Sequence, residues 1–183
     1  MESRDPGEGH VSANLIAFMR AILGGAKVSG KLEVIENLLG RIDTLLIGGA
    51  MAYTFFTARG LRVGRSLVEA ALVDATRTIE RDAGRRGMRL ELPSDHVVTD
   101  RLEVGAAHET LDVEDPAIGD RLGVDIGPAT VARYAAVIAD ARTIVWNGPM
   151  GVFEIDAFAH GTLAIAEAVA ASAATSIVGG GDS

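Results

Sequence analysis

The sequence contains no cysteine. A disulfide framework and a thiolate metal site are therefore excluded, and the absence fits a reducing cytoplasm, where we expect this protein. Histidine is scarce, and its positions show no spacing typical of metal ligands or of a Ser-His-Asp arrangement. We interpret the four histidines as ordinary loop or surface residues: His10, His96, His108 and His160.

The sequence also lacks an apolar run long enough to cross a membrane. The longest run near the start, residues 13–23, is short and carries Arg20. Glu2, Asp5 and Glu8 stand where a secretory signal would have basic residues. We therefore expect no signal peptide and no membrane partner.

Positive charge is in short supply, because the formal net charge is −8 at pH 7. A phosphate backbone requires a basic face, so this balance argues against nucleic acid as a partner. It does not exclude a nucleotide, whose few charges need only a local positive site.

A repeated unit dominates what is present: a short apolar run, then glycines, then a helical stretch. It occurs clearly at residues 21–25, 44–49, 143–149 and 176–181, and more weakly at residues 124–128. Such alternation predicts a parallel sheet covered by helices on both faces, a three-layer α/β fold of the Rossmann-like kind. The length of 183 residues suits one domain.

Four helices are expected between the apolar runs, over residues 31–39, 66–85, 129–141 and 161–171. Ser66 and Glu69 match a capping box at the start of the second helix, and Pro128 suits the first position of the third. Residues 103–119 are acidic and irregular, and we expect a surface excursion there.

The glycine clusters mark the expected binding edge. In an open parallel sheet, ligands bind beyond the carboxyl ends of the strands, where glycine lets the backbone approach a ligand and directs amide hydrogens at it. Lys27 and Lys31 follow the first cluster, and at helical spacing both ammonium groups would project from one side. A solvated surface pair is the alternative interpretation.

Three further features leave alternatives open. Residues 25–31 match a Walker A string up to its lysine, but Leu32 stands where a hydroxyl should reach magnesium, which disfavours a true P-loop. Asp182 is either a magnesium ligand or a plain turn residue. Glu154 either accepts hydrogen bonds from ribose hydroxyls or is a solvated acid. No G-x-G-x-x-G motif follows a strand, so a Rossmann dinucleotide site is not expected.

Five blocks of sequence resemble, in order, the C-terminal, nucleotide-binding domain of phosphoglycerate kinase. They are AILGGAKVS at residues 21–29, IGGAMAYTF at 47–55, GVDIGP at 123–128, VWNGPMGVFE at 145–154 and GGGDS at 179–183. We accordingly divide the chain into a non-matching arm, residues 1–20, and a nucleotide-binding domain, residues 21–183. The resemblance implies phosphoryl transfer between 1,3-bisphosphoglycerate and ADP in glycolysis, with Mg²⁺.

The resemblance also implies roles for individual residues. Lys27 would steady the phosphoryl group in transfer, and Lys31 would contact the nucleotide phosphates. Asp182 would hold the magnesium ion that accompanies ADP or ATP. The other implied nucleotide-binding residues are Gly25, Ala26, Gly123, Asn147 at the phosphates, Pro149, Met150, Glu154 at the ribose, Gly180, Gly181 and Ser183. Trp146, the only tryptophan, adjoins Asn147 and is expected to report ligand binding.

Several departures from the family pattern shape the functional hypothesis. The family has an N-terminal substrate domain and further C-terminal elements, so we expect a sheet that is incomplete at its C-terminal end. Gly30 stands where the family has aspartate, and Ala50 where it has a third glycine. We expect a chain that is inactive alone, because it cannot bring both substrates together. The alternatives are a half-enzyme with a separate phosphoglycerate-binding partner and a non-catalytic interaction protein.

Overall fold

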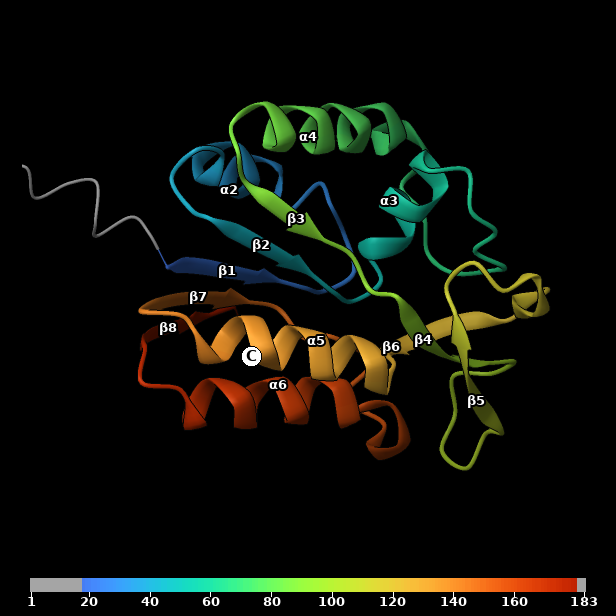
Figure 1. The fold of residues 1–183 in the computed structure, drawn as a ribbon. Helices are drawn as coiled ribbons and strands as arrows, with labels where there is room; N and C mark the ends of the chain where they lie inside the picture. Colours follow the sequence, from blue (N-terminus) through green and yellow to red (C-terminus); the bar gives the residue numbers. More distant parts are fainter. Residues whose placement is uncertain (1–17, 181–183) are drawn as a thin grey trace, which may run out of the picture.

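A five-stranded parallel sheet forms the centre of the molecule (Figure 1). The structure, a computed structural model, describes residues 18–180. The strand order is β3-β2-β1-β7-β8, and every neighbouring pair is parallel. The strands are β1 (Met19–Leu23), β2 (Thr44–Ile47), β3 (Arg89–Glu91), β7 (Thr143–Asn147) and β8 (Thr175–Gly179). The predicted parallel sheet is confirmed.

Helices cover both faces of this sheet (Figure 1). One face carries α2 (Leu32–Leu38), α3 (Ala52–Ala58) and α4 (Val73–Arg85), and the other carries α5 (Pro128–Ala139) and α6 (His160–Ala171). Because side chains alternate along a strand, Leu23 packs into the core on the first face and Ile22 into the core on the second. The three-layer prediction is therefore confirmed.

A second, smaller sheet stands beside the first. Its strands are β4 (Asp95–Thr99), β5 (His108–Asp112) and β6 (Leu122–Ile126), in the antiparallel order β5-β4-β6. The weak repeat at residues 124–128 was expected to supply a parallel strand, which is wrong because β6 pairs antiparallel with β4. The segment 103–119 is also more regular than expected, since it contains the largely exposed edge strand β5.

Two buried aspartates attach the small sheet to the helices of the main one. Asp95 of β4 accepts hydrogen bonds from the backbone N–H groups of Ala129 (2.9 Å) and Thr130 (2.7 Å), in the first turn of α5. Asp125 of β6 accepts one from Gly161 N (2.7 Å), in the first turn of α6. Carboxylates satisfy N–H groups that a helix start leaves unpaired, so each aspartate caps a helix from another element.

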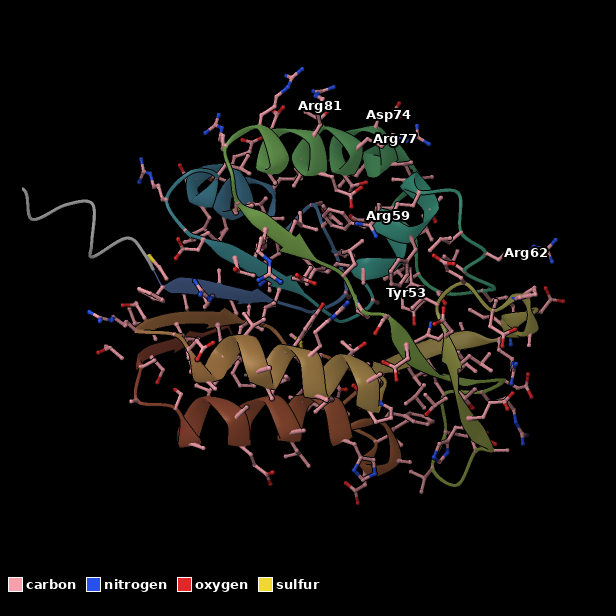
Figure 2. The ribbon with its side chains drawn as sticks, viewed as in Figure 1. Tyr53, Arg59, Arg62, Asp74, Arg77 and Arg81 are labelled. Atoms are coloured by element: carbon pink, nitrogen blue, oxygen red, sulfur yellow. The ribbon has the colours of Figure 1, made fainter. Side chains whose placement is uncertain are left out.

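The start of α4 corrects one local prediction. The helix begins at Val73, after a short 3-10 turn, η1 (Ala70–Leu72), and no side chain caps it. Ser66 instead accepts a hydrogen bond from Gly123 N (2.9 Å), and the Glu69 carboxylate binds Ser29. The prediction of a capping box is therefore wrong, because the side chains of Ser66 and Glu69 form hydrogen bonds with residues distant in the sequence. The outer face of α4 presents Arg77 and Arg81 to solvent (Figure 2).

The main sheet has β1 at its centre and β3 and β8 at its edges. Met19 and Arg20, assigned to the N-terminal arm from the sequence, form the start of β1 and pair with β7. At one edge of the sheet, β8 exposes the side chains of Ile177 and Val178, by 59% and 50%.

Among residues 18–180, no helix has the length and apolar character needed to span a bilayer.

Candidate functional site

Three loops meet at the carboxyl edge of the parallel sheet. They follow β1, β2 and β7, and their backbones are hydrogen-bonded to one another. Gly25 N donates to Pro149 O (2.8 Å), Gly49 N donates to Met150 O (2.9 Å), and Met51 N donates to Gly25 O (3.0 Å). The three glycine-rich segments therefore form one connected surface at this edge.

Close backbone contact explains the glycines in these loops. Gly49 has φ +66°, and a Cβ there would lie 2.5 Å from Gly25 N. Gly148 has φ +94°, and its Cβ would lie 2.5 Å from Gly24 O. The amides of Gly25 and Gly49 are also occupied by carbonyls of the neighbouring loop. The expectation that these two amides point at a ligand is therefore wrong, because they hold the loops together.

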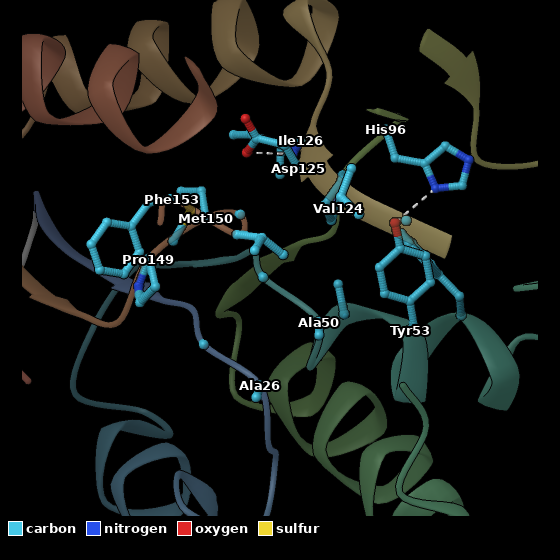
Figure 3. Close-up of a pocket in the computed structure, with 18 of the residues that line it drawn as sticks. Ala26, Ala50, Tyr53, His96, Val124, Asp125, Ile126, Pro149, Met150 and Phe153 are labelled. Atoms are coloured by element: carbon cyan, nitrogen blue, oxygen red, sulfur yellow. Dashed lines mark hydrogen bonds between the residues drawn. The ribbon is translucent and has the colours of Figure 1, made fainter. Parts of the chain in front are cut away.

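A pocket of about 220 Å³ opens beside these loops (Figure 3). Its walls come from the three loops, α3, the start of β4, and β6. Six of the residues predicted to bind nucleotide line it: Gly25, Ala26, Gly123, Pro149, Met150 and Glu154. The structure thus brings together residues separated by more than a hundred positions in the chain.

Tyr53 and His96 form one wall of the pocket, and neither was predicted to belong to the site (Figure 3). The Tyr53 hydroxyl and His96 Nδ1 are hydrogen-bonded at 2.9 Å, and the two rings stack with centroids 5.8 Å apart. Gly123 makes room for this pair, since a Cβ there would lie 1.5 Å from the Tyr53 hydroxyl. His96 is 2% exposed, so its interpretation as a loop or surface residue is wrong.

Burial favours the uncharged form of both members of this pair. Burial lowers the pKa of His96 to about 4, against the opposing effect of the carboxylates of Asp95 and Asp112. Burial also raises the pKa of Tyr53, and the negative charge of Asp125 acts in the same direction. Val97 and Val98, which follow His96 directly, are the sequence signal that could have identified a strand at this position.

Asp125 is the third unpredicted residue in the pocket wall. Burial raises the pKa of its carboxyl to about 7, although hydrogen bonds from the N–H groups of Gly161 and Ile126 act to lower it. Gly151 and Gly161 pack closely around this carboxyl, because a Cβ on either would lie 2.3 Å from Asp125 Oδ1. The pocket therefore contains an acid that titrates near neutral pH.

The cationic part of the site is the lysine loop, residues 24–31. Lys31 Nζ contacts Asn147 Oδ1, so the loop after β1 meets the end of β7. Lys27 is exposed, and these two are the only lysines in the chain. The prediction that the two lysines project from one side of a helix is wrong. Both residues precede α2, and Lys31 N donates to Val28 O (2.8 Å) in a turn.

The structure shows the surroundings of Ala50 and Gly30, which depart from the family pattern, and of Leu32, which departs from the Walker A pattern. Ala50 lines the pocket, whereas a Cβ at Gly30 would meet only Lys27 O, at 3.9 Å. A side chain at position 30 would therefore fit. Leu32 packs against the core beneath α2, as expected for an apolar helix residue and not for a magnesium-binding hydroxyl position.

The predicted metal ligand, Asp182, lies outside the described residues, as do Gly181 and Ser183. Gly180 is exposed just beyond β8 and does not line the pocket. Within residues 18–180, no group of three or more histidine, aspartate or glutamate side chains is arranged to hold a metal ion.

Trp146 occupies a different place from the one expected of a direct reporter. Its ring packs in the core between the sheet and the helices α5 and α6. Its Nε1 donates to Gly148 O at 2.8 Å, so it touches the back of a site loop. Trp146 therefore contacts a site loop and does not line the pocket.

The three-layer arrangement, with its loops and pocket at the carboxyl edge, defines an open parallel α/β domain, a class of fold in which ligands generally bind at that edge. A family model described as phosphoglycerate kinase matches residues 10–183. The chain belongs to the phosphoglycerate kinase family. The match begins at residue 10, within the segment assigned to the N-terminal arm.

Curated relatives and solved structures agree with this assignment. The chain is 52% identical over 165 residues to phosphoglycerate kinase of Geotalea daltonii, covering 90% of this chain and 41% of that protein. It is 58% identical over 163 residues to the enzyme of Rubrobacter xylanophilus, covering 89% and 41%. A solved phosphoglycerate kinase from Coxiella burnetii superposes with a TM-score of 0.87 at 44% identity, covering 90% and 42%. The chain thus spans about two-fifths of the length of these relatives.

Proposed function

We propose that this chain is the ADP/ATP-binding, C-terminal part of a phosphoglycerate kinase. The observation that carries the proposal is the junction of an apolar pocket with the chain's only two lysines, at one edge of the sheet. A nucleotide combines a flat, largely apolar base with a short chain of phosphates. The pocket suits the base, and the lysine loop suits the phosphates.

The geometry supports a distinct role for each group. The base would lie in the pocket beside the loops after β1 and β7, with Glu154 at the exposed rim toward the ribose. Lys31 and Asn147 would hold the phosphates, and exposed Lys27 would neutralise the phosphoryl group during transfer. Such transfer depends mainly on positioning and charge neutralisation, which lysines supply.

Mg²⁺ bound with the nucleotide would neutralise further phosphate charge. Asp182 is the residue we propose to hold it, and Gly180, Gly181 and Ser183 would lie beside the nucleotide in the same segment. The described residues add no acidic cluster of their own to this metal.

The reaction we propose is phosphoryl transfer between 1,3-bisphosphoglycerate and ADP, the glycolytic reaction named by the family. The sugar-acid substrate would bind to a part outside this chain. Turnover therefore requires a phosphoglycerate-binding half, either joined to this chain or supplied separately, because catalysis depends on holding both reactants together.

A lysine-specific probe tests nucleotide binding directly. Reductive methylation with ¹³C-formaldehyde keeps both lysines charged and labels only Lys27, Lys31 and the terminal amine. Titration with Mg-ADP is expected to shift both lysine methyl signals with one saturating curve. Lys31→Gln should weaken binding about tenfold. Arg101→Gln, which removes an exposed cation beside Glu103, should leave it unchanged.

Activity forms the second test. The chain alone is expected to show no turnover in a coupled kinase assay, and addition of a phosphoglycerate-binding half should restore it. If neither lysine methyl signal shifts at a high concentration of Mg-ADP, in a sample shown to be folded, the proposed nucleotide site is refuted.

A further inference from the structure

Glu69 makes an unexplained connection to the lysine loop. It lies just before η1, and its carboxylate reaches across to Ser29. Oε2 accepts a hydrogen bond from Ser29 N (3.0 Å), and Oε1 accepts one from the Ser29 hydroxyl (2.6 Å). Ser29 stands midway between Lys27 and Lys31, so this two-point contact grips the centre of the loop.

The other side of Glu69 is fixed to the core. Its backbone N–H donates to Thr54 Oγ1 at 3.1 Å, and Thr54 is a buried residue of α3. Next to Ser29, Val28 is fully buried in the same core. The lysine loop is therefore held from below by Val28 and from the side by Glu69.

These contacts favour the ionised form of Glu69. Burial acts to raise the pKa of its carboxyl, but the hydrogen bonds from Ser29 and Val28, together with the positive charge of Lys27, hold the pKa below its ordinary value. Hydrogen bonds to an ionised acceptor are stronger than those between neutral groups. An ionised Glu69 thus binds Ser29 more firmly than a neutral side chain would.

We propose that Glu69 is a positioning residue for the phosphate site: by holding Ser29, it sets the course of the backbone between Lys27 and Lys31 and presents both ammonium groups. This inference rests on the proposed nucleotide-binding function. Glu69 does not touch the ligand in this scheme, and it acts only through the loop.

Three variants separate positioning from other roles. Glu69→Ala removes both contacts and is expected to raise the Kd for Mg-ADP about tenfold, since small displacements of binding groups are expensive. Glu69→Gln keeps an acceptor for Ser29 N and a donor for the Ser29 hydroxyl, but the contacts are weaker without the charge, so it should recover part of the affinity and leave the Kd about threefold above the parent. Glu80→Ala is the matched control, because Glu80 joins α4 to Arg59 at the end of α3.

The ¹³C-methyl signals of Lys27 and Lys31, recorded without nucleotide, provide the second readout. In Glu69→Ala both signals should move toward the values of a free lysine and sharpen, whereas Glu69→Gln and Glu80→Ala should leave them in place. This measurement does not depend on nucleotide binding. If the parent failed to bind Mg-ADP, the proposed function would fail, and the lysine signals would still decide whether Glu69 orders the loop.

Two results would overturn the inference. One is an unchanged pair of lysine signals in folded Glu69→Ala. The other is a Kd in Glu69→Gln that is as weak as the Kd in Glu69→Ala, which would assign the effect to charge and not to position. If Glu69→Ala does not fold, Ser29→Ala replaces it, because it removes only the shorter contact, made by an exposed side chain.

Discussion

The lysine loop and the apolar pocket lie side by side, but they are held in place by different means. The lysine loop is one continuous segment, fixed by buried Val28 and by the contact between Glu69 and Ser29. The pocket wall is assembled from separate elements, including Tyr53 of α3, His96 of β4 and Asp125 of β6. The loop therefore depends on local anchors, whereas the pocket depends on the packing of the whole domain.

The largest expected effect comes from breaking the contact between the loops. Gly49→Ala places a methyl group 2.5 Å from Gly25 N at φ +66°. We expect a loss of about 3 kcal/mol or more in the free energy of unfolding, from overlap and backbone strain together. Urea denaturation measures it.

Gly60→Ala is the control for that substitution. Gly60 also has a positive φ, of +80°, but a Cβ there would meet nothing within 4 Å. Its cost should be only about 1 kcal/mol, from backbone conformation alone. Equal losses in the two variants would contradict the role of close loop contact.

The next effect is the pH dependence of the two buried titratable groups in the pocket. The pKa of Asp125 is raised to about 7, so the unfolded state loses its proton first and stability falls as pH rises from about 4 to 7. The pKa of His96 is lowered to about 4, so the unfolded state gains its proton first and stability rises over about pH 4 to 6.5. The two slopes oppose each other in the parent.

Single substitutions should reveal each slope. Asp125→Asn is expected to become more stable as pH rises from 4.5 to 6.5, and His96→Gln less stable, by up to about 1.4 kcal/mol per pH unit. Unfolding free energies measured at several pH values provide the test. Parallel profiles in the two variants would show that these groups are not the source.

A smaller effect is expected at the aromatic wall. Tyr53→Phe leaves His96 Nδ1 without its partner and should reduce stability by about 1–2 kcal/mol. Tyr134→Phe is the matched control, because Tyr134 is also buried but donates to Ile47 O, and neither residue lines the pocket. Both variants should lose stability, and only Tyr53→Phe should weaken Mg-ADP binding, by a few fold. Isothermal titration calorimetry distinguishes them.

The smallest effect concerns Ala50. Ala50→Gly removes one methyl group from the pocket wall, and we expect Mg-ADP to bind about two- to threefold more tightly, at about 0.5–1 kcal/mol of stability. Ala139→Gly, on the exposed side of α5, should show the same loss of stability with no change in affinity. A weaker affinity in Ala50→Gly would mean that the methyl group contacts the ligand favourably.

The sequence was informative where structure is local. The apolar runs of β1, β2, β7 and β8 and the helices α2, α4, α5 and α6 follow from short-range patterns, whereas α3 was not predicted. The five matching blocks marked the family. The sequence was least informative where distant segments meet. Tyr53, His96 and Asp125 come from three elements. Their contacts depend on an antiparallel sheet, and the sequence pattern of residues 90–126 did not predict that sheet.

Side-chain partners from distant segments explain the other errors. Ser66 and Glu69 match a capping box by spacing, but Gly123 and Ser29 compete for their side chains. Lys27 and Lys31 have helical spacing, but the chain forms a turn between them, in which the Val28 side chain packs into the core. Spacing alone identifies these residues without determining their partners.

The interlocked loops at the sheet edge have a consequence for ligand affinity. Their backbones are already ordered by hydrogen bonds to one another, and glycines at 49 and 148 leave no space between them. A ligand that binds this edge meets a preorganised surface, so little conformational entropy is lost on association. The loops become ordered when the domain folds. The same contacts between the loops therefore contribute both to the stability of the domain and to the affinity of this edge for a ligand.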